Sequence, residues 1–519
     1  MTLFNCKPAR RIASGFHPDP TICETPQGTY LMVNSSFEFF PGLPVFESED
    51  GMHWRKIGDA MNRPGQFPYE TMGNSQGIYA PTLRYHDGEY YLIVTNVNKG
   101  NMILTSADPH AGWSEPIWVE GWPGIDPSLF FDDDGTAYIC GNEGGEPDEN
   151  GEREPAGIYL SKIDVNTGTV LTKRQRICGG ITGSNPEGPH MYKRGGFYYL
   201  MWAEGGTESG HMENIARSTS PTGPYEMYPG NPLITNRSTH LTLQAIGHCD
   251  CAHFDGDRTL MVFHGTRNND EYPAQGWVGR EPYAVWFEWE NDWPKLADQS
   301  YDCELNGCGE SLERDVEWIT PAIDKTGRFT VGGGDKRMTA GPVPREDGSL
   351  CDSNGVTVDI HAAEQDFSLD DGPTMVGTRQ TDFRFEFGAT LSDARELTDG
   401  ETGVAVYANA NHYLTITVHA ADDEDLLRVE AVAHNAGLVS VVGSVNESAD
   451  ATLRLIVRGD DRGYAFAVKN TFTGEEQPLG RIPGKVLSFV NAGGFTGILL
   501  GVYAHGRGEI TFSDVRYTV

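Results

Sequence analysis

Short runs of aromatic and β-branched residues recur in the first 270 residues, each after a turn rich in glycine or aspartate. This pattern is typical of β-hairpins. Five copies occur, at residues 27–31, 87–92, 134–139, 195–200 and 256–261. Aligned on Tyr30, Tyr91, Tyr138, Tyr199 and Leu260, they are separated by 61, 47, 61 and 61 residues. Five repeated all-strand units predict a five-bladed β-propeller with four-stranded blades.

The pattern changes in the second half of the chain. Residues from about 297 to 327 are irregular and acidic, which predicts a linker. Beyond them, polar and apolar residues alternate in runs at 383–387, 403–407, 413–418, 453–457 and 508–512. Such runs predict a β-sandwich. We therefore expect an all-β chain with a propeller at 1–296, a linker at 297–327 and a sandwich at 328–519.

The propeller repeat also aligns residues of chemical interest. Eleven or twelve positions before each aligned residue stand Asp19, Tyr79, Asp126, Glu187 and His248. If the strand before each hairpin is the innermost one, these five side chains meet at the mouth of the central axis. Three carboxylates on one small ring repel each other and shift their pKa values apart, which is typical of catalytic sites.

Composition and charge exclude several classes of protein. The 519 residues carry a net charge of −35 at pH 7, which repels phosphate backbones and anionic lipids. We therefore expect no nucleic-acid partner and no membrane partner. No apolar run approaches the length of a membrane helix. The start of the chain lacks the pattern of a signal peptide, and nine cysteines form an odd, scattered set, so we expect reduced thiols and a cytoplasmic location.

Metal sites have weaker support. The segment 248–253 contains two cysteines at alternate positions, but no second cysteine or histidine pair completes a zinc site. His248 stays open as a ligand for calcium or another cation on the axis, or as a neutral histidine of the pocket. The acidic turn at 132–135 lacks the order of a calcium-binding loop, and 332–335 lacks the ending of a phosphate loop.

Several segments together resemble glycoside hydrolase family 43, and most closely its two-domain β-xylosidase and α-L-arabinofuranosidase branch. The resemblance rests first on Ser14–Pro20, Gly77–Tyr85, Gly124–Ser128 and Pro186–His190. It extends to Ala203–Glu208, Val278–Glu281, Gly377–Gln380 and Gly493–Gly497. In that branch the C-terminal domain is a concanavalin-like β-sandwich, and the stretch at 493–497 approaches the mouth of the active site.

The resemblance implies a role for each aligned carboxyl group. Asp19 is the general base, Glu187 is the general acid, and Asp126 adjusts the pKa of the acid and holds it in place. The implied activity is exo-acting, inverting hydrolysis that releases a terminal β-D-xylose or α-L-arabinofuranose from xylo- or arabinoxylo-oligosaccharides. Inversion calls for two carboxyl groups about 6.5–9.5 Å apart. No cofactor is required, the partner is the oligosaccharide, and a homo-oligomer stays open.

Other residues are implied to bind the sugar. Arg280 binds the terminal residue, His248 lies beneath it, and Phe37 shapes the pocket. Tyr79 stands where the family usually has tryptophan, so the choice between xylose and arabinose stays open. Phe495 is our candidate contact from the sandwich; the alternative is a core aromatic of that domain.

Two other functions compete with this hypothesis. A fructan hydrolase shares the predicted five-bladed plan and three carboxylates, but its signature motifs are absent. A non-catalytic glycan-binding propeller would not need the three acidic residues at the aligned positions.

Overall fold

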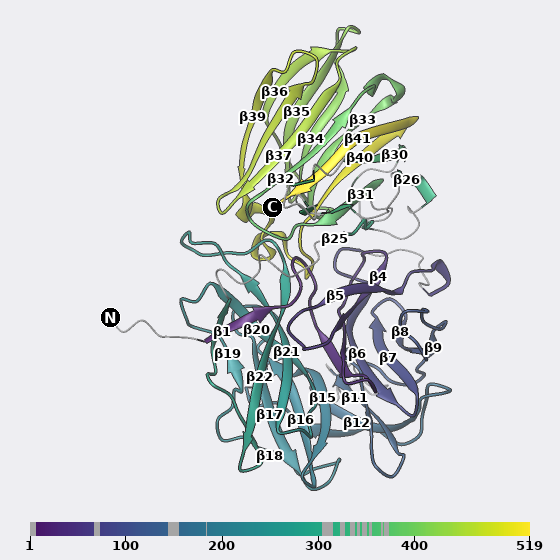
Figure 1. The fold of residues 1–519 in the computed structure, drawn as a ribbon, viewed down its shortest axis with the longest axis vertical. Helices are drawn as coiled ribbons and strands as arrows, with labels where there is room; N and C mark the ends of the chain where they lie inside the picture. Colours follow the sequence, from purple (N-terminus) through teal and green to yellow (C-terminus); the bar gives the residue numbers. More distant parts are fainter. Residues whose placement is uncertain are drawn as a thin grey trace.

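The structure is a computed structural model. It describes residues 7–66, 73–143, 155–182, 184–303, 315–321, 327–332, 338–339, 343–344, 350–351, 355–364, 367 and 373–519. The described chain is built almost entirely of β-strands, in two bodies stacked along the long axis of the molecule (Figure 1). None of the described helices has the length and apolar composition that a membrane span needs.

The N-terminal body has a propeller fold in which consecutive strands form antiparallel sheets. The first sheet contains β2 (Thr21–Glu24), β3 (Tyr30–Val33), β4 (Gly42–Ser48) and β5 (Arg55–Met61). The second contains β6 (Ile78–His86), β7 (Glu89–Asn96), β8 (Gly100–Ser106) and β9 (Ile117–Trp118). The third contains β10 (Ser128–Phe131), β11 (Ala137–Glu143), β12 (Gly157–Asp164), β13 (Thr169–Val170) and β14 (Gln175–Cys178).

Two further sheets complete this body. The fourth contains β15 (Glu187–Arg194), β16 (Phe197–Glu204), β17 (Met212–Ser218), β18 (Glu226–Met227) and β19 (Ile234–Thr235). The fifth contains β20 (Leu243–Ala252), β21 (Arg258–Arg267), β22 (Arg280–Glu290), β23 (Trp293–Lys295), β1 (Lys7–Arg11) and β24 (Tyr301–Cys303). Strand β1, from the N-terminal end of the described chain, pairs antiparallel with β22 and parallel with β24. The fifth sheet therefore joins the two ends of the body.

The repeat seen in the sequence marks the second strand of each sheet. The aligned residues lie in β3, β7, β11, β16 and β21. The first strands of the sheets contact each other in turn: β2 with β6, β6 with β10, β10 with β15, β15 with β20, and β20 with β2. Residues that precede these first strands or lie within them are therefore brought around one axis.

The C-terminal body is a sandwich of two sheets, as expected for a concanavalin-like domain. One sheet has the order β26 (Phe329–Gly332), β30 (Val356–His361), β41 (Glu509–Thr518), β32 (Phe385–Leu391), β37 (Leu453–Asp460), β38 (Gly463–Asn470) and β39 (Glu476–Pro483). The other has the order β31 (Met375–Arg379), β40 (Leu499–Arg507), β33 (Thr398–Asn409), β34 (His412–Ala420), β35 (Leu426–Asn435) and β36 (Leu438–Ser448). Alternating apolar side chains from both sheets form one core, which includes Phe387, Leu414 and Val502.

A few short elements complete the description. Two small strand pairs join β25 (Asp315–Val316) with β27 (Met338–Thr339) and β28 (Val343–Pro344) with β29 (Leu350–Cys351). The short helices are η1 (Pro64–Gln66), η3 (Ala394–Glu396), η4 (Gly484–Leu487) and α1 (Phe489–Ala492). Part of the predicted linker, at 304–314 and 322–326, lies outside the described residues.

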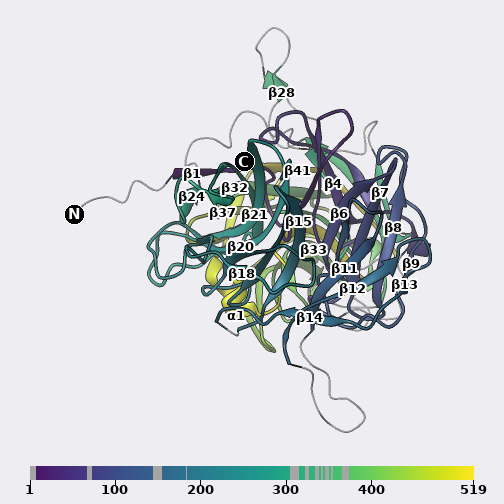
Figure 2. The same ribbon diagram turned by 90° about the horizontal axis from the view of Figure 1, so that it is seen from below.

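The two bodies share an interface of packed side chains. Figure 1 shows the bodies one above the other, and Figure 2 looks at them from the propeller end. Phe16, Phe37 and Phe39 of the propeller join one buried apolar cluster with Tyr407 and Leu499 of the sandwich. The described part of the linker touches both bodies. Thr320 forms a β-bridge with Phe40 of the propeller, and Ile319 forms one with Gly377 of the sandwich. The sandwich is therefore held against the propeller near the end where the aligned residues meet.

Candidate active site

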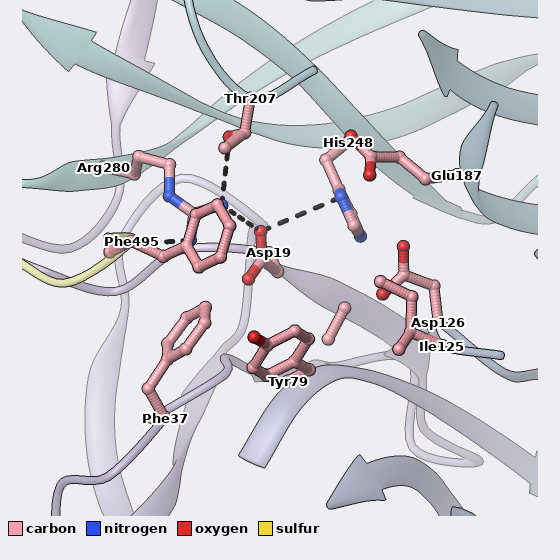
Figure 3. A pocket seen from close by; sticks show the side chains of 11 residues that line it. Asp19, Phe37, Tyr79, Ile125, Asp126, Glu187, Thr207, His248, Arg280 and Phe495 are labelled. Carbon is pink, nitrogen blue, oxygen red and sulfur yellow. Dashed lines mark hydrogen bonds and ion pairs between the residues drawn. The ribbon is translucent and has the colours of Figure 1, made fainter. Parts of the chain in front are cut away.

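One pocket collects all eight side chains that the sequence marks (Figure 3). They are Asp19, Phe37, Tyr79, Asp126, Glu187, His248, Arg280 and Phe495. The pocket encloses about 360 Å³, including its opening to solvent. Ala80, Ile125 and Thr207 complete its lining. Each lies in a segment that resembles the family, but the sequence pattern assigns none of them a role.

Irregular backbone places the aligned side chains at the pocket. Asp19, Asp126 and His248 each adopt a left-handed conformation, with φ of 51°, 51° and 55°. Strand pairing also shifts in register near Tyr79 in β6, near Glu187 in β15 and near His248 in β20. Left-handed non-glycine residues and bulges cost energy in a sheet and are concentrated at functional sites, where they redirect a side chain.

Asp19 is held in its ionised form. Its Oδ1 accepts a hydrogen bond from Arg280 Nη1 at 2.6 Å, and its Oδ2 accepts one from Ser35 Oγ at 2.5 Å. Burial by itself would raise the pKa of Asp19, but the positive charge of Arg280, followed by His248, outweighs it and holds the pKa well below its usual value. An ionised carboxylate in a pocket can accept a proton.

Glu187 is in the opposite state. Burial, followed by the negative charges of Asp126 and Asp19, raises the pKa of Glu187 to about 8. Its carboxyl group is therefore largely protonated at neutral pH and can donate a proton. The pocket thus contains one group suited to a base and one suited to an acid.

Asp126 lies beside Glu187 and is fixed by the backbone of Gly188, the residue that follows Glu187. Its Oδ2 accepts a hydrogen bond from the Gly188 N–H at 2.9 Å. Burial raises the pKa of Asp126, and the charge of Asp19 adds to that effect. Figure 3 shows Asp126 and Glu187 on one side of Asp19, with Arg280 and Phe495 on the other.

Arg280 connects the base to the rest of the pocket. Besides Asp19, its Nη1 donates to Thr207 Oγ1 at 3.1 Å, and its Nη2 donates to the backbone carbonyl of Phe495 at 3.4 Å. The backbone N–H of Asp19 donates to His264 Nδ1 at 3.1 Å. Thr207, His264 and Ser35 do not share the repeat position of the carboxyl groups, and the sequence pattern assigns them no role, although Thr207 lies in the segment Ala203–Glu208 that resembles the family.

Three aromatic rings form one wall of the pocket. The ring centroids of Phe37 and Tyr79 are 4.9 Å apart, and those of Phe37 and Phe495 are 5.8 Å apart in a stacked arrangement. Phe495 comes from the sandwich and is 41% exposed. It therefore lies at the mouth of the pocket and not in the sandwich core.

The metal hypotheses find no support. Among the described residues, no group of three or more histidine, cysteine or acidic side chains could hold a metal ion. The ring of His248 stacks on His264 at 5.6 Å, and its Nδ1 lies 3.8 Å from Asp19 Oδ1. Cys249 and Cys251 are buried thiols whose pKa values burial raises well above the ordinary value, so they stay protonated. Nothing in this arrangement supports a calcium ion at His248.

Comparison with known proteins gives a consistent result. The family model "Glycosyl hydrolases family 43" matches residues 9–294, and the model "Beta xylosidase C-terminal Concanavalin A-like domain" matches residues 343–518. The chain is 34% identical over 515 residues to a non-reducing end α-L-arabinofuranosidase of Bacteroides ovatus, covering 96% of this chain and 91% of the relative. It is 30% identical over 551 residues to a xylosidase/arabinosidase of Butyrivibrio fibrisolvens, covering 98% and 97%.

Solved structures agree over nearly the whole length. The crystal structure of a xylan β-1,4-xylosidase from Bacillus halodurans superposes with a TM-score of 0.83 at 25% identity, covering 98% of this chain and all of the other. A family 43 protein from the xyloglucan locus of Bacteroides ovatus superposes with a TM-score of 0.81 at 29% identity, covering 97% and 98%.

Proposed function

This chain belongs to glycosyl hydrolase family 43, and we propose that Asp19, Asp126 and Glu187 are its catalytic carboxyl groups. The protein is an exo-acting glycoside hydrolase of the β-xylosidase and α-L-arabinofuranosidase type, which releases a terminal pentose from an oligosaccharide. The observation that carries the assignment of roles is the contrast in one pocket between Asp19, held ionised, and Glu187, held protonated.

In the proposed mechanism, Glu187 gives its proton to the glycosidic oxygen as the bond to the anomeric carbon breaks. Asp19 takes a proton from a water molecule, whose oxygen attacks the anomeric carbon from the opposite face. One attack on one carbon inverts its configuration, and no covalent glycosyl-enzyme forms. The products are the free pentose, the shortened oligosaccharide, a protonated Asp19 and an ionised Glu187, and solvent exchange restores both carboxyl groups.

The neighbouring residues support these two roles. Burial raises the pKa of Glu187 and the charge of Asp126 raises it further, which keeps Glu187 protonated at neutral pH. Arg280 keeps Asp19 ionised through the 2.6 Å hydrogen bond, and we assign its remaining donors to the terminal sugar. We assign His248 to the floor of the sugar site, and Phe37, Tyr79 and Phe495 to its apolar wall.

We further propose that the N-terminal body is a five-bladed propeller. The closed circle of contacts between β2, β6, β10, β15 and β20 supports five blades around one axis. The pairing of β1 with β22 supports a ring that is closed by joining the first and last strands of the body.

The experiment that tests the function uses paired chromogenic substrates. The purified protein should release nitrophenol from nitrophenyl β-D-xylopyranoside, nitrophenyl α-L-arabinofuranoside or both, and the ratio of the two kcat/KM values gives the sugar preference. Proton NMR of the earliest product should show an inverted anomeric configuration. Net retention would contradict the role of Asp19 as base, and absence of release from both substrates would favour a glycan-binding protein.

A further inference from the structure

Ser75 contacts three residues around the pocket through its three polar groups. Its backbone N–H donates to Glu38 Oε1 at 3.1 Å, and its carbonyl accepts the Tyr79 hydroxyl at 2.9 Å. Its Oγ accepts the backbone N–H of Phe495 at 2.7 Å. Ser75 itself is buried and left-handed, with φ of 56°. One residue outside the pocket lining therefore holds two of the residues that form the aromatic wall.

The contact with Phe495 crosses between the two bodies. Phe495 lies in the loop between α1 and β40, and both of its backbone polar groups bond to the propeller, the N–H to Ser75 and the carbonyl to Arg280. The loop approaches Ser75 so closely that a Cβ on Gly494 would lie 2.4 Å from Ser75 Oγ. The position of the Phe495 ring therefore depends on the hydroxyl of Ser75.

The contact with Tyr79 fixes a second ring. The Tyr79 and Phe495 centroids are 6.1 Å apart with an edge-to-face angle of 75°. Because the Tyr79 hydroxyl bonds to the carbonyl of Ser75 and Phe495 bonds to its side chain, the two rings are held relative to each other by the same residue. Aromatic pairs depend on such geometry for their contribution to binding.

Glu38 holds Ser75 from the other side. It stands between Phe37 and Phe39, which are both buried in the apolar cluster at the interface. The Glu38 side chain is buried; its Oε1 bonds to the Ser75 N–H, and its Oε2 has no hydrogen-bond partner among the described residues. A buried carboxyl group with an unpartnered oxygen calls for an explanation. The bond to the N–H of the left-handed Ser75 offers one, because it fixes the backbone of that residue.

We propose that Ser75 is a positioning residue that sets the affinity of the pocket for the terminal pentose by fixing Tyr79 and Phe495, and that Glu38 holds Ser75 in place. The inference rests on the proposed function, since it assigns the aromatic wall to sugar binding. Ser75 acts through the two rings and not on the reacting atoms. Its loss should therefore weaken binding more than it slows the chemical step.

The test compares Ser75→Ala with Asn74→Ala in the full-length enzyme. Asn74 is a matched control: its Oδ1 accepts the backbone N–H of Ala410, which is another bond from propeller to sandwich, but Asn74 does not line the pocket. Ser75→Ala should raise KM for the better nitrophenyl pentoside by about five- to fiftyfold, the range for one lost buried hydrogen bond, with kcat within about threefold. Asn74→Ala also removes one hydrogen bond between the two bodies, so it should lower Tm about as much as Ser75→Ala does. It should leave KM within about twofold of the parent value. Ser75→Gly, which keeps the left-handed backbone, serves as the second variant if Ser75→Ala does not fold.

Tyr79→Phe removes only the hydroxyl that bonds to Ser75, and it should also raise KM with little change in kcat. If Ser75→Ala and Ser75→Gly have the KM of the parent enzyme, or if Asn74→Ala raises KM as much as they do, Ser75 is only part of the domain interface and the inference is wrong. That result leaves the proposed function intact. If the parent enzyme releases neither pentose and binds neither free sugar in a titration, the proposed function fails and this inference fails with it.

Discussion

The carboxyl groups of Asp19 and Glu187 differ in their surroundings and not in their chemistry. Asp19 is buried and Glu187 is half-buried, and this loss of contact with water alone would raise both pKa values. Arg280 reverses that effect for Asp19, whereas Asp126 adds to it for Glu187. One positive and one negative neighbour therefore assign the base and the acid.

The first prediction separates these two roles by substitution. Glu187→Gln should lose least activity on dinitrophenyl glycosides, because that leaving group departs without a proton, and most on natural oligosaccharides. Asp19→Asn should lose about 10²–10⁴-fold in kcat on every substrate, because each still needs an activated water. Measuring kcat/KM against leaving-group pKa for both variants checks this. Equal dependence on the leaving group would mean that the roles are misassigned.

The second prediction concerns pH. Activity requires Glu187 in its protonated form, so kcat/KM should fall as the pH rises through about 8. Activity also requires ionised Asp19, whose lowered pKa places the acidic limb below the ordinary carboxyl range. Asp126→Asn removes a negative neighbour, lowers the pKa of Glu187 and should move the alkaline limb about one pH unit lower.

The matched control is Asp132→Asn. Asp132 lies outside the pocket lining and bonds to Lys193 Nζ at 2.6 Å, so this change also removes one negative charge. Its pH profile should have the alkaline limb of the parent enzyme. An alkaline limb that stays in place in Asp126→Asn would show that Asp126 does not set the pKa of the acid.

At the scale of elements, the site depends on how the segments before the inner strands are shaped. Asp126 stands two residues after Gly124, which has φ of 85°. Gly124 lies so close to β11 that a Cβ on it would be 1.8 Å from the carbonyl oxygen of Asn142. The backbone can take this path only with glycine. The path leads directly to the left-handed Asp126.

The third prediction tests that requirement. Gly124→Ala should lower the free energy of unfolding by about 3 kcal/mol or more, because it adds a backbone clash to the cost of a left-handed alanine. Gly121→Ala is the control, since Gly121 has φ of 76° in the same connection and its Cβ would meet nothing within 4 Å. It should cost about 1 kcal/mol. Urea denaturation of both variants measures the difference. Equal losses of unfolding free energy would mean that the close approach to Asn142 does not make glycine necessary at this position.

The sequence predicts elements wherever a pattern repeats or alternates. The propeller hairpins and the runs that became β32, β33, β34, β37 and β41 have such patterns. Strand β36 does not, because most of its residues are exposed on both faces and show no alternation. In the predicted linker, β24 is a strand only because it pairs with β1, almost 300 residues earlier. Such long-range pairing leaves no local signal.

The same distinction holds within the site. Asp19, Tyr79, Asp126, Glu187 and His248 share one position in the repeat, so the sequence can predict that they converge. Ser75 and Thr207 have no such position; tertiary contacts bring them to the site. Arg280, Phe37 and Phe495 share no repeat position, and only the resemblance to a family indicates them.

At the scale of the whole molecule, the pocket belongs to both bodies. The propeller supplies the carboxyl groups, and the sandwich supplies Phe495 at the mouth. Trp277 of the propeller is buried in the apolar core of the sandwich, which fixes the two bodies against each other. Phe495 of the sandwich closes one side of the pocket, and we expect this closure to favour chain ends over internal linkages.

The last prediction tests this closure with Phe495→Ala. Phe495 is 41% exposed and stacks on Phe37 at 5.8 Å, so its removal takes away a wall of the pocket without opening a core cavity. We expect KM to rise by about tenfold or more, because an aromatic contact with the sugar is lost. Tm should change by no more than about 2 °C, since the space that the ring leaves opens to solvent and is no enclosed cavity in the core. Phe472→Ala is the control, because Phe472 is 95% exposed in the sandwich and lies outside the pocket. If Phe495→Ala instead lowers Tm strongly and leaves KM unchanged, Phe495 stabilises the domain interface. The wall of the sugar site must then come from Phe37 and Tyr79 of the propeller alone.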